Sequence, residues 1–223
     1  HALPVAHPEL LAAKLADFLQ QDRSAVVPKQ RIAASFSRAA QTYDDAAHLQ
    51  RAVGSALLAT LPASLEGVVL DIGCGTGFVT GALLEKTATV IAIDLAPGML
   101  LHTQQRYPAS RTVQADMEKL PLADARARWL LSNLAIQWAS DASRCLAEWR
   151  RVLQPDGRLL FSTFLPGTLR ELAQCWASVD DAVHVNDFVP EEALTAALHA
   201  AGFAAVEAVR ATHTLHYPQL RDL

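Results

Sequence analysis

The stretch that most constrains the fold of this chain is VVLDIGCGTGFVT, residues 68 to 80. Its apolar start predicts a buried parallel strand, which Asp71 closes. Glycines follow at positions 73, 75 and 77, and an apolar helical pattern resumes at Phe78. Glycine allows turns that a Cβ forbids and lets the backbone approach a ligand closely. A strand, a glycine turn and a helix in this order predict a cradle for a nucleotide-type ligand.

The spacing of the glycines separates two kinds of nucleotide site. A dinucleotide fingerprint needs glycine at the first, third and sixth positions, and here the sixth is Phe78. Glycine at the first, third and fifth positions after an acidic residue instead resembles motif I of the class I methyltransferases, which use S-adenosyl-L-methionine (SAM). That resemblance implies an α/β, Rossmann-like sheet with helices on both faces. The alternative is a tight turn that binds nothing. The cofactor contacts that motif I implies are Asp71, Gly73, Cys74, Gly75 and Gly77.

Length and composition fit one α/β domain with an extra segment. The chain has 223 residues, of which 51% are apolar, enough to bury a substantial core. A net charge of −4 argues against general nucleic-acid binding. Three cysteines are an odd number without metal-binding spacing, so we expect no metal site and a reducing, cytoplasmic environment. No apolar run reaches the length of a membrane span.

Two further predicted strands lead into acidic residues. Residues 89 to 94 end in Asp94, and residues 111 to 115 are followed by Asp116. Taken singly, each acid is most often a solvated strand end, but the carboxyl ends of parallel strands meet at one edge of the sheet. There Asp94 can accept from both ribose hydroxyls, and Asp116 from the adenine amino group. NAD would explain Asp94 but not Gly77 or Asp116. The apolar side chains expected beside the base are Leu95, Met99, Leu100 and Met117.

The second half of the chain carries the predicted acceptor region. A strand at residues 129 to 132 precedes Asn133, Leu134, Gln137 and Trp138, in a turn where a methyl acceptor would approach. We expect the first two to contact the cofactor and the last two to contact the substrate. The elements expected beyond this turn are a helix at 142 to 153 that stops at a 155 to 157 turn, a strand at 158 to 164, a helix at 168 to 181, a loop with His184, Asn186 and Phe188, a helix near Pro190 and a sixth strand at 204 to 215.

Two amphipathic helices are predicted ahead of motif I, at residues 29 to 42 and from about residue 45 to 61. In class I methyltransferases such helices lie over the cofactor as a lid. Tyr43, between them, is then placed to reach the SAM carboxylate with its hydroxyl. The alternative is a half-buried core tyrosine with a solvated tip.

Longer stretches resemble one family, the malonyl-[acyl-carrier protein] O-methyltransferases of biotin synthesis. They are KQRIAASFSRAAQTYDDAAHLQ, LDIGCGTG, IDLAPGML, ADMEKLPL, SNLAIQW, LQPDGRLLFSTF, GTLRELAQCWASVDD and HVNDF. The last strand of that family is missing here, so we expect a C-terminal truncation. Residues 1 to 21 resemble the end of the biotin-pathway carboxylesterase, an α/β-hydrolase, which predicts a fusion fragment; a tag remnant followed by an ordinary helix is the alternative. The expected segments are this remnant at 1 to 21, a linker at 22 to 28, the helical lid at 29 to 66 and the SAM-binding domain at 67 to 223.

The resemblance implies that the free carboxylate of a malonyl thioester, carried by acyl carrier protein or coenzyme A, attacks the SAM methyl group. Such a carboxyl has a pKa of about 4 or below, so we expect no catalytic base. An arginine suits the task of holding the carboxylate. The candidates are Arg38, Arg51 and Arg144, although any single arginine in such a position is more often a solvated surface residue. Two other functions stay open: a carboxyl methyltransferase of the trans-aconitate type, and a SAM-binding module without catalysis.

Overall fold

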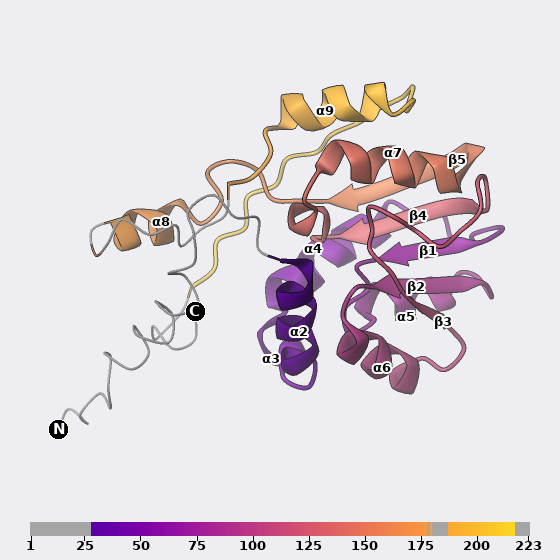
Figure 1. The fold of residues 1–223 in the computed structure, drawn as a ribbon, viewed down its shortest axis with the longest axis horizontal. Coiled ribbons are helices and arrows are strands. Elements are labelled where there is room, and N and C mark those ends of the chain that lie inside the picture. The colour runs from indigo at the N-terminus through magenta and orange to yellow at the C-terminus, as the bar shows by residue number, and fades with distance from the viewer. Residues whose placement is uncertain (1–27, 178, 180–186, 217–223) are drawn as a thin grey trace.

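The computed structural model describes residues 28 to 177, residue 179 and residues 187 to 216. A five-stranded sheet lies at its centre, with the strand order β3-β2-β1-β4-β5 and all pairs parallel (Figure 1). Because β1 pairs with both β2 and β4, the strand order reverses there, which is where ligands bind in open α/β sheets. The strands are β1 Val69–Ile72, β2 Val90–Asp94, β3 Arg111–Gln114, β4 Ala127–Asn133 and β5 Leu153–Ser162.

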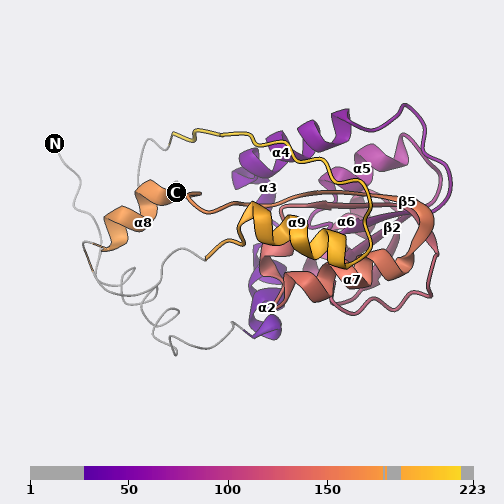
Figure 2. The ribbon, with the colours of Figure 1, turned by 90° about the horizontal axis from the view of Figure 1, so that it is seen from above.

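Helices cover both faces of the sheet. Helices α4 and α5 lie on one face, and α7 with α9 lies on the other (Figure 2). Helix α8 stands apart from the sheet (Figure 1). The described helices are α2 Lys29–Ala39, α3 Tyr43–Ala46, α4 His48–Ala59, α5 Phe78–Leu84, α6 Pro97–Arg106, the 3-10 turn η1 Ile136–Trp138, α7 Ala142–Val152, α8 Arg170–Ala177 and α9 Glu191–Ala200. The α/β fold with an N-terminal helical segment is therefore confirmed. None of these helices is long and apolar enough to cross a membrane.

The core explains why Val68, Val69 and Leu70 form a continuous apolar run that leads into β1. Val69 packs with α5 on one face, whereas Leu70 and Ile72 pack with α7 on the other. Trp149 of α7 is fully buried against this second face. A strand covered on both faces must be apolar at successive positions, so its hydrophobic pattern does not alternate. This rigid strand holds the glycine turn that follows it.

The predicted helix at residues 45 to 61 is wrong as a single element, because the chain breaks between α3 and α4. Ala47 leaves the helical conformation at φ −83° and ψ 32°. The Arg51 guanidinium of α4 donates to the Asp44 carbonyl of α3 at 2.8 Å, across the break. A hydrogen bond from a side chain to a carbonyl has no signature in hydrophobic periodicity.

Two strand predictions also need correction. Residues 204 to 215 form no strand, and most of their side chains are exposed, with Val209 94% accessible. Apolar alternation predicts a strand only if a partner strand lies beside it, and none pairs with this segment in the described structure. The predicted turn at residues 155 to 157 instead lies within β5, as a bulge between the pairs Ala127–Leu153 and Trp129–Arg158.

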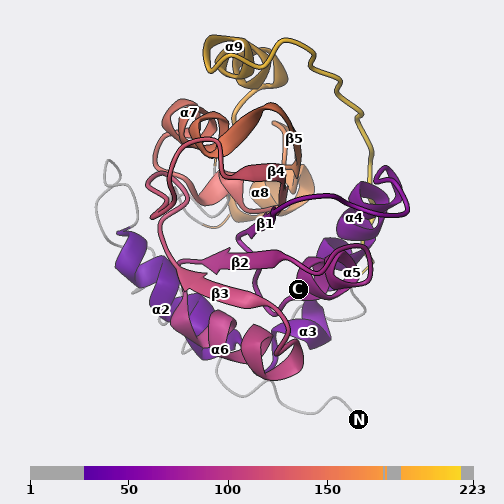
Figure 3. The same cartoon turned by 90° about the vertical axis from the view of Figure 1, so that its right-hand side faces the viewer.

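The N-terminal helices α2 and α3 lie at the end of the sheet where the strands finish (Figure 1), and α2 packs against α6 (Figure 3). Met99 of α6 is buried against the aromatic side chains of Phe36 and Tyr43. The predicted helix within residues 1 to 21, most of the predicted linker, and His184 and Asn186 lie outside the described residues.

Candidate active site

A pocket of about 770 Å³, open to solvent, lies at the carboxyl ends of the first four strands. Helix α2 and Tyr43 form one wall, and the residues that follow β1, β2, β3 and β4 form the rest. The acidic strand ends therefore gather at one edge, as parallel strands require. The predicted cofactor residues that line the pocket are Tyr43, Gly73, Gly75, Asp94, Leu95, Met99, Asp116, Met117, Asn133 and Leu134.

The glycine turn presents bare backbone to the pocket. Gly73 has φ +71°, and a Cβ there would lie 2.4 Å from the Cβ of Ala135, so no side chain fits. Gly75 has φ +55°, and its Cβ position has no atom within 4 Å. A side chain at Gly75 would project into open space that a ligand can fill. The turn therefore has the shape that a closely approaching nucleoside needs.

Asp94 lies at the centre of the pocket wall. Its Oδ2 accepts the Gly75 amide hydrogen at 2.9 Å, and its Oδ1 accepts that of Ala96 at 2.8 Å. Burial raises the pKa of Asp94, and these amide bonds lower it in part. An ionised carboxylate can accept about four hydrogen bonds, so lone pairs remain for a ligand diol.

Four predicted cofactor contacts do not line the pocket: Asp71, Cys74, Gly77 and Leu100. Leu100, expected beside the base, is instead buried with Cys74 and Ala92. The buried Asp71 accepts the Thr80 hydroxyl at 2.6 Å, and burial raises the pKa of Asp71 to about 7. The Cys74 thiol lies 4.0 Å from the Thr103 hydroxyl. Gly77, at φ +87°, has the Thr103 side chain 3.0 Å from its Cβ position. Asp71, Cys74 and Gly77 therefore support the turn from behind, through Thr80 and Thr103.

The loop after β3 forms the opposite end of the pocket. Asp116 and Met117 line it, and so does Lys29 of α2. The Lys29 ammonium lies 2.6 Å from Asp116 Oδ2 and 2.6 Å from Glu118 Oε1. Sequence reasoning missed Lys29. A cation at the first residue of a helix opposes the helix dipole, and that unfavourable placement is the signal that could have pointed to a distant acidic partner.

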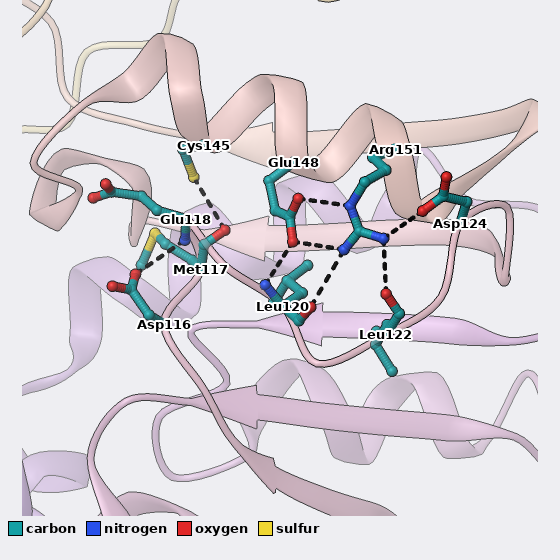
Figure 4. Close-up of polar contacts among 9 residues, drawn as sticks. All are labelled: Asp116, Met117, Glu118, Leu120, Leu122, Asp124, Cys145, Glu148 and Arg151. Atoms are coloured by element: carbon teal, nitrogen blue, oxygen red, sulfur yellow. Dashed lines mark hydrogen bonds and ion pairs between the residues drawn. The ribbon is translucent and has the colours of Figure 1, made fainter.

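The same loop is fastened to α7 by Arg151 (Figure 4). The Arg151 guanidinium donates to both carboxylate oxygens of Glu148, to Asp124 at 2.6 Å and to the Leu122 carbonyl at 2.8 Å. Glu148 in turn accepts the Leu120 amide hydrogen at 2.6 Å. A guanidinium with this many partners holds a loop without a regular ladder in one conformation. The loop of residues 116 to 124, part of which lines the pocket, is therefore held against α7.

The turn after β4 is also held in place. Asn133 donates to the Gln50 carbonyl at 2.9 Å and accepts the Ser162 hydroxyl at 2.8 Å, which ties the turn to α4 and β5. Leu134 has φ +48°, an uncommon conformation for a residue with a side chain. Gln137 does not line the pocket, and its amide donates to the Leu134 carbonyl at 2.7 Å. Gln137 thus supports the turn, where a substrate contact was predicted.

Three aromatic side chains meet at the lid side of the pocket. The ring of Phe36 lies edge-on to Tyr43 at 6.2 Å and to Trp138 at 5.4 Å between centroids. Burial raises the pKa of Tyr43, and the nearby charges of Asp94 and Asp44 raise it further. The Tyr43 phenol therefore keeps its proton at neutral pH and can donate a hydrogen bond into the pocket. Trp138, predicted as a substrate contact, lines the pocket and is 39% exposed.

The three arginines predicted to hold a substrate carboxylate do not line the pocket. Arg38 and Arg144 are exposed, and Arg51 is bound to Asp44. The cation among the described lining residues is Lys29, a residue that we did not predict. Whether an arginine on a helix faces the pocket depends on which face of that helix packs on the domain. Hydrophobic periodicity alone does not determine that face for every residue of the helix.

Comparison with solved structures places the fold among methyltransferases. The putative methyltransferase in a complex with the Trm112 activator from Haloferax volcanii matches with a TM-score of 0.63 at 20% identity, covering 75% of both chains. An S-adenosylmethionine-dependent methyltransferase from Mesorhizobium loti matches with a TM-score of 0.55 at 24% identity, covering 66% of this chain and 79% of that one. A family described as "Methyltransferase domain" also matches residues 70–161.

Closer relatives define the family. The chain is 44% identical to the biotin biosynthesis bifunctional protein BioHC of Cellvibrio japonicus, over 100% of this chain and 45% of that protein. It is 43% identical to the malonyl-[acyl-carrier protein] O-methyltransferase of Serratia marcescens, over 88% of this chain and 76% of that enzyme. With the corresponding enzyme of Yersinia pestis the identity is 47%, over 74% of this chain and 61% of that enzyme. The chain therefore belongs to the SAM-dependent methyltransferases and, within them, to the malonyl-[acyl-carrier protein] O-methyltransferase family.

Proposed function

We propose that this protein transfers a methyl group from SAM to the free carboxylate of a malonyl thioester on acyl carrier protein, in biotin biosynthesis. The observation that carries the proposal is the pocket at the strand ends, where bare glycine backbone, Asp94 and Asp116 meet under an aromatic lid. The relatives named above share 43% and 47% of their aligned residues with the chain and have this activity in their names.

The pocket residues fit each part of SAM. Asp94 keeps free lone pairs for the ribose hydroxyls, and Gly75 leaves open space beside it. Asp116 offers a carboxylate to the amino group of the base, and Met99 and Met117 offer apolar surface to its faces. The Tyr43 hydroxyl can donate a hydrogen bond to the carboxylate of the methionine part of SAM. When bound, SAM supplies an electrophilic methyl group on a cationic sulfur.

The residues of the chain contribute to this reaction by aligning the two reactants and by excluding water. A malonyl carboxylate is already ionised at neutral pH, so no side chain has to remove a proton. Alignment of two reactants can lower a barrier by roughly 7–11 kcal/mol when the geometry is held closely. The hydrogen bonds of Asn133 hold the turn after β4, and those of Arg151 hold the loop after β3, so both sides of the pocket are fixed in position. Phe36, Tyr43 and Trp138 form the side that excludes water, and we propose Trp138 as the acceptor contact.

An assay on the purified chain tests the proposal. The chain is incubated with SAM and, in separate reactions, with malonyl-, acetyl- or succinyl-acyl carrier protein or trans-aconitate. The masses of the products are measured by mass spectrometry. We expect a gain of one methyl group on the malonyl thioester and none on the acetyl thioester, which has no free carboxylate. Comparable methylation of trans-aconitate would favour the other carboxyl methyltransferase. Binding of SAM without turnover on any acceptor would identify a binding module.

The alignment with the bifunctional relative supports a second part of the proposal. It extends over the whole chain, residues 1 to 21 included, within a protein more than twice as long. We therefore propose that residues 1 to 21 are the end of a carboxylesterase-type domain joined through a linker to the methyltransferase. Sequencing the reading frame upstream of His1 tests this, and a frame without an α/β-hydrolase sequence would contradict it.

A further inference from the structure

The side chain of Lys29 connects α2, the first helix of the predicted lid, to the loop after β3, where the adenine base is expected to bind. Its ammonium lies 2.6 Å from Asp116 Oδ2 and 2.6 Å from Glu118 Oε1, residues that follow it by 87 and 89 positions. Lys29 is the first residue of α2, so these two ion pairs fix the beginning of the lid helix. Lys29 and Asp116 both line the pocket, whereas Glu118 lies behind them.

The two carboxylates need this cation. Glu118 has a side chain only 5% exposed, and besides Lys29 it accepts the Ser140 amide hydrogen at 2.5 Å. Asp116 lies two residues away and accepts the Glu118 amide hydrogen at 3.0 Å. Two like charges at such short range favour uptake of a proton by one of them unless a cation balances them. Burial raises the pKa of Asp116, but the bonds from Lys29 and from the Glu118 amide lower it below its ordinary value overall.

The protonation state of Asp116 decides which base it can bind. An ionised carboxylate only accepts hydrogen bonds, whereas a protonated one also donates. Adenine presents an amino group at its six position, which donates. Hypoxanthine presents a carbonyl oxygen at the same place, which accepts. Asp116 uses two of its lone pairs for Lys29 and the Glu118 amide, and its carboxyl is 32% exposed, so further lone pairs remain for a base.

We propose that Lys29 is a positioning residue that keeps Asp116 ionised and oriented, so that the pocket accepts a 6-amino purine and rejects a 6-oxo purine. This inference rests on the proposed binding of SAM in the same pocket. Because Lys29 belongs to α2, recognition of the base and closure of the lid depend on the same ammonium group.

Titration calorimetry with two product analogues tests the inference without turnover. S-adenosylhomocysteine and S-inosylhomocysteine differ only in the amino or oxo group at the six position. They are titrated into the wild-type chain and into the variants Lys29→Met, Lys29→Arg and Lys119→Met. Lys119 is an exposed lysine of the same loop that contacts Asp116 through its backbone alone, so Lys119→Met is the matched control.

The wild-type chain should bind the adenosine compound more tightly by at least about tenfold, as expected for a site that pairs with an amino group. Lys29→Met should reduce this ratio to within about threefold of unity, because Asp116 without its ammonium partner is no longer held in one orientation and can take up a proton and donate to the oxo group. Lys29→Arg and Lys119→Met should keep the wild-type ratio. Should Lys29→Met lower thermal stability too far for titration, Lys29→Gln replaces it as a neutral, polar variant.

Two other results would count against these ideas in different ways. If Lys29→Met weakens both compounds equally and leaves their ratio unchanged, Lys29 only holds the lid, and the inference is overturned. If the wild-type chain binds neither compound, the proposed function itself fails.

Discussion

The Thr76 hydroxyl of the glycine turn donates a 2.6 Å hydrogen bond to Asp44, a residue of the short lid helix α3. The other oxygen of Asp44 receives Arg106 of α6 at 2.8 Å, and Arg51 of α4 lies 3.4 Å away. Burial raises the pKa of Asp44, but these partners outweigh burial and lower it overall. Asp44 therefore holds α3 against the glycine turn, and Lys29 holds the beginning of α2 against the loop after β3.

Replacing Asp44 by alanine should loosen the lid over the pocket. The variant loses the bond from Thr76 and two ion pairs, so we expect SAM binding to weaken by about 1–3 kcal/mol. Titration calorimetry measures the change. Asp45→Ala is the matched control, because Asp45 is the exposed neighbour on the same helix and should leave affinity unchanged. Equal effects of the two substitutions would show that Asp44 acts only through general charge.

Asp94→Ala should weaken SAM binding by about 1–3 kcal/mol, the cost of losing a charge-assisted bond to the ribose. The control is Asp141→Ala. Asp141 also accepts two backbone amide hydrogens, those of Ser143 and Arg144, but it caps α7 and does not line the pocket. That control should lose about 0.5–2 kcal/mol of stability and no affinity. An unchanged dissociation constant for Asp94→Ala would remove Asp94 from the cofactor site.

Tyr43→Phe removes a hydroxyl and keeps the ring that packs against Phe36. If the hydroxyl binds SAM, affinity should fall by about 0.5–1.5 kcal/mol, the net worth of one hydrogen bond. The melting temperature without SAM should hardly move, and differential scanning calorimetry checks this. A lower melting temperature with unchanged affinity would instead make Tyr43 a core residue with a solvated tip.

Asp71 should make stability depend on pH. Its pKa is raised from the ordinary 3.8 to about 7 in the folded protein, chiefly by burial. Between these two values the folded chain holds a proton that the unfolded chain has lost, so the contribution of Asp71 to stability falls as pH rises through this window. Asp71→Asn has no such proton and keeps an oxygen for the Thr80 hydroxyl.

Urea unfolding of both proteins at pH 5 and pH 7.5 measures the effect. The stability of the wild type minus that of Asp71→Asn should decrease towards the higher pH, with a slope approaching about 1.4 kcal/mol per pH unit. Contributions from other groups cancel in this difference when Asp71 is the only site changed. Parallel pH curves would mean that Asp71 titrates normally.

The parts of the site that follow from local sequence were predictable. Asp94 was identified because it ends a short apolar strand, and Asp116 because it follows the next predicted strand; parallel strands bring such ends together. Gly73 and Gly75 were identified because a turn with positive φ needs glycine. These inferences use residues within a few positions of one another, where periodicity and turn chemistry determine the structure.

The parts that were missed depend on contacts between distant segments. Lys29 and Glu118 are 89 positions apart, and Asp44 and Thr76 are 32 apart, so no local pattern relates them. The three arginines were candidates by charge alone, and the packing of α2, α4 and α7 on the domain leaves them outside the pocket. The sixth strand failed for a related reason, because a strand is defined by its neighbour as much as by its own alternation.

The position of β5 at the end of the strand order affects how molecules of this protein meet in solution. In the described part of the chain no strand pairs with its outer side, and Leu159, Leu160 and Phe161 are only partly buried. An open edge of this kind offers hydrogen-bonding groups to another chain and is a common starting point for aggregation. The bulge and the exposed Arg158 protect the first half of β5. At high concentration, association between molecules should therefore begin at residues 159 to 162, where a single added charge would slow it.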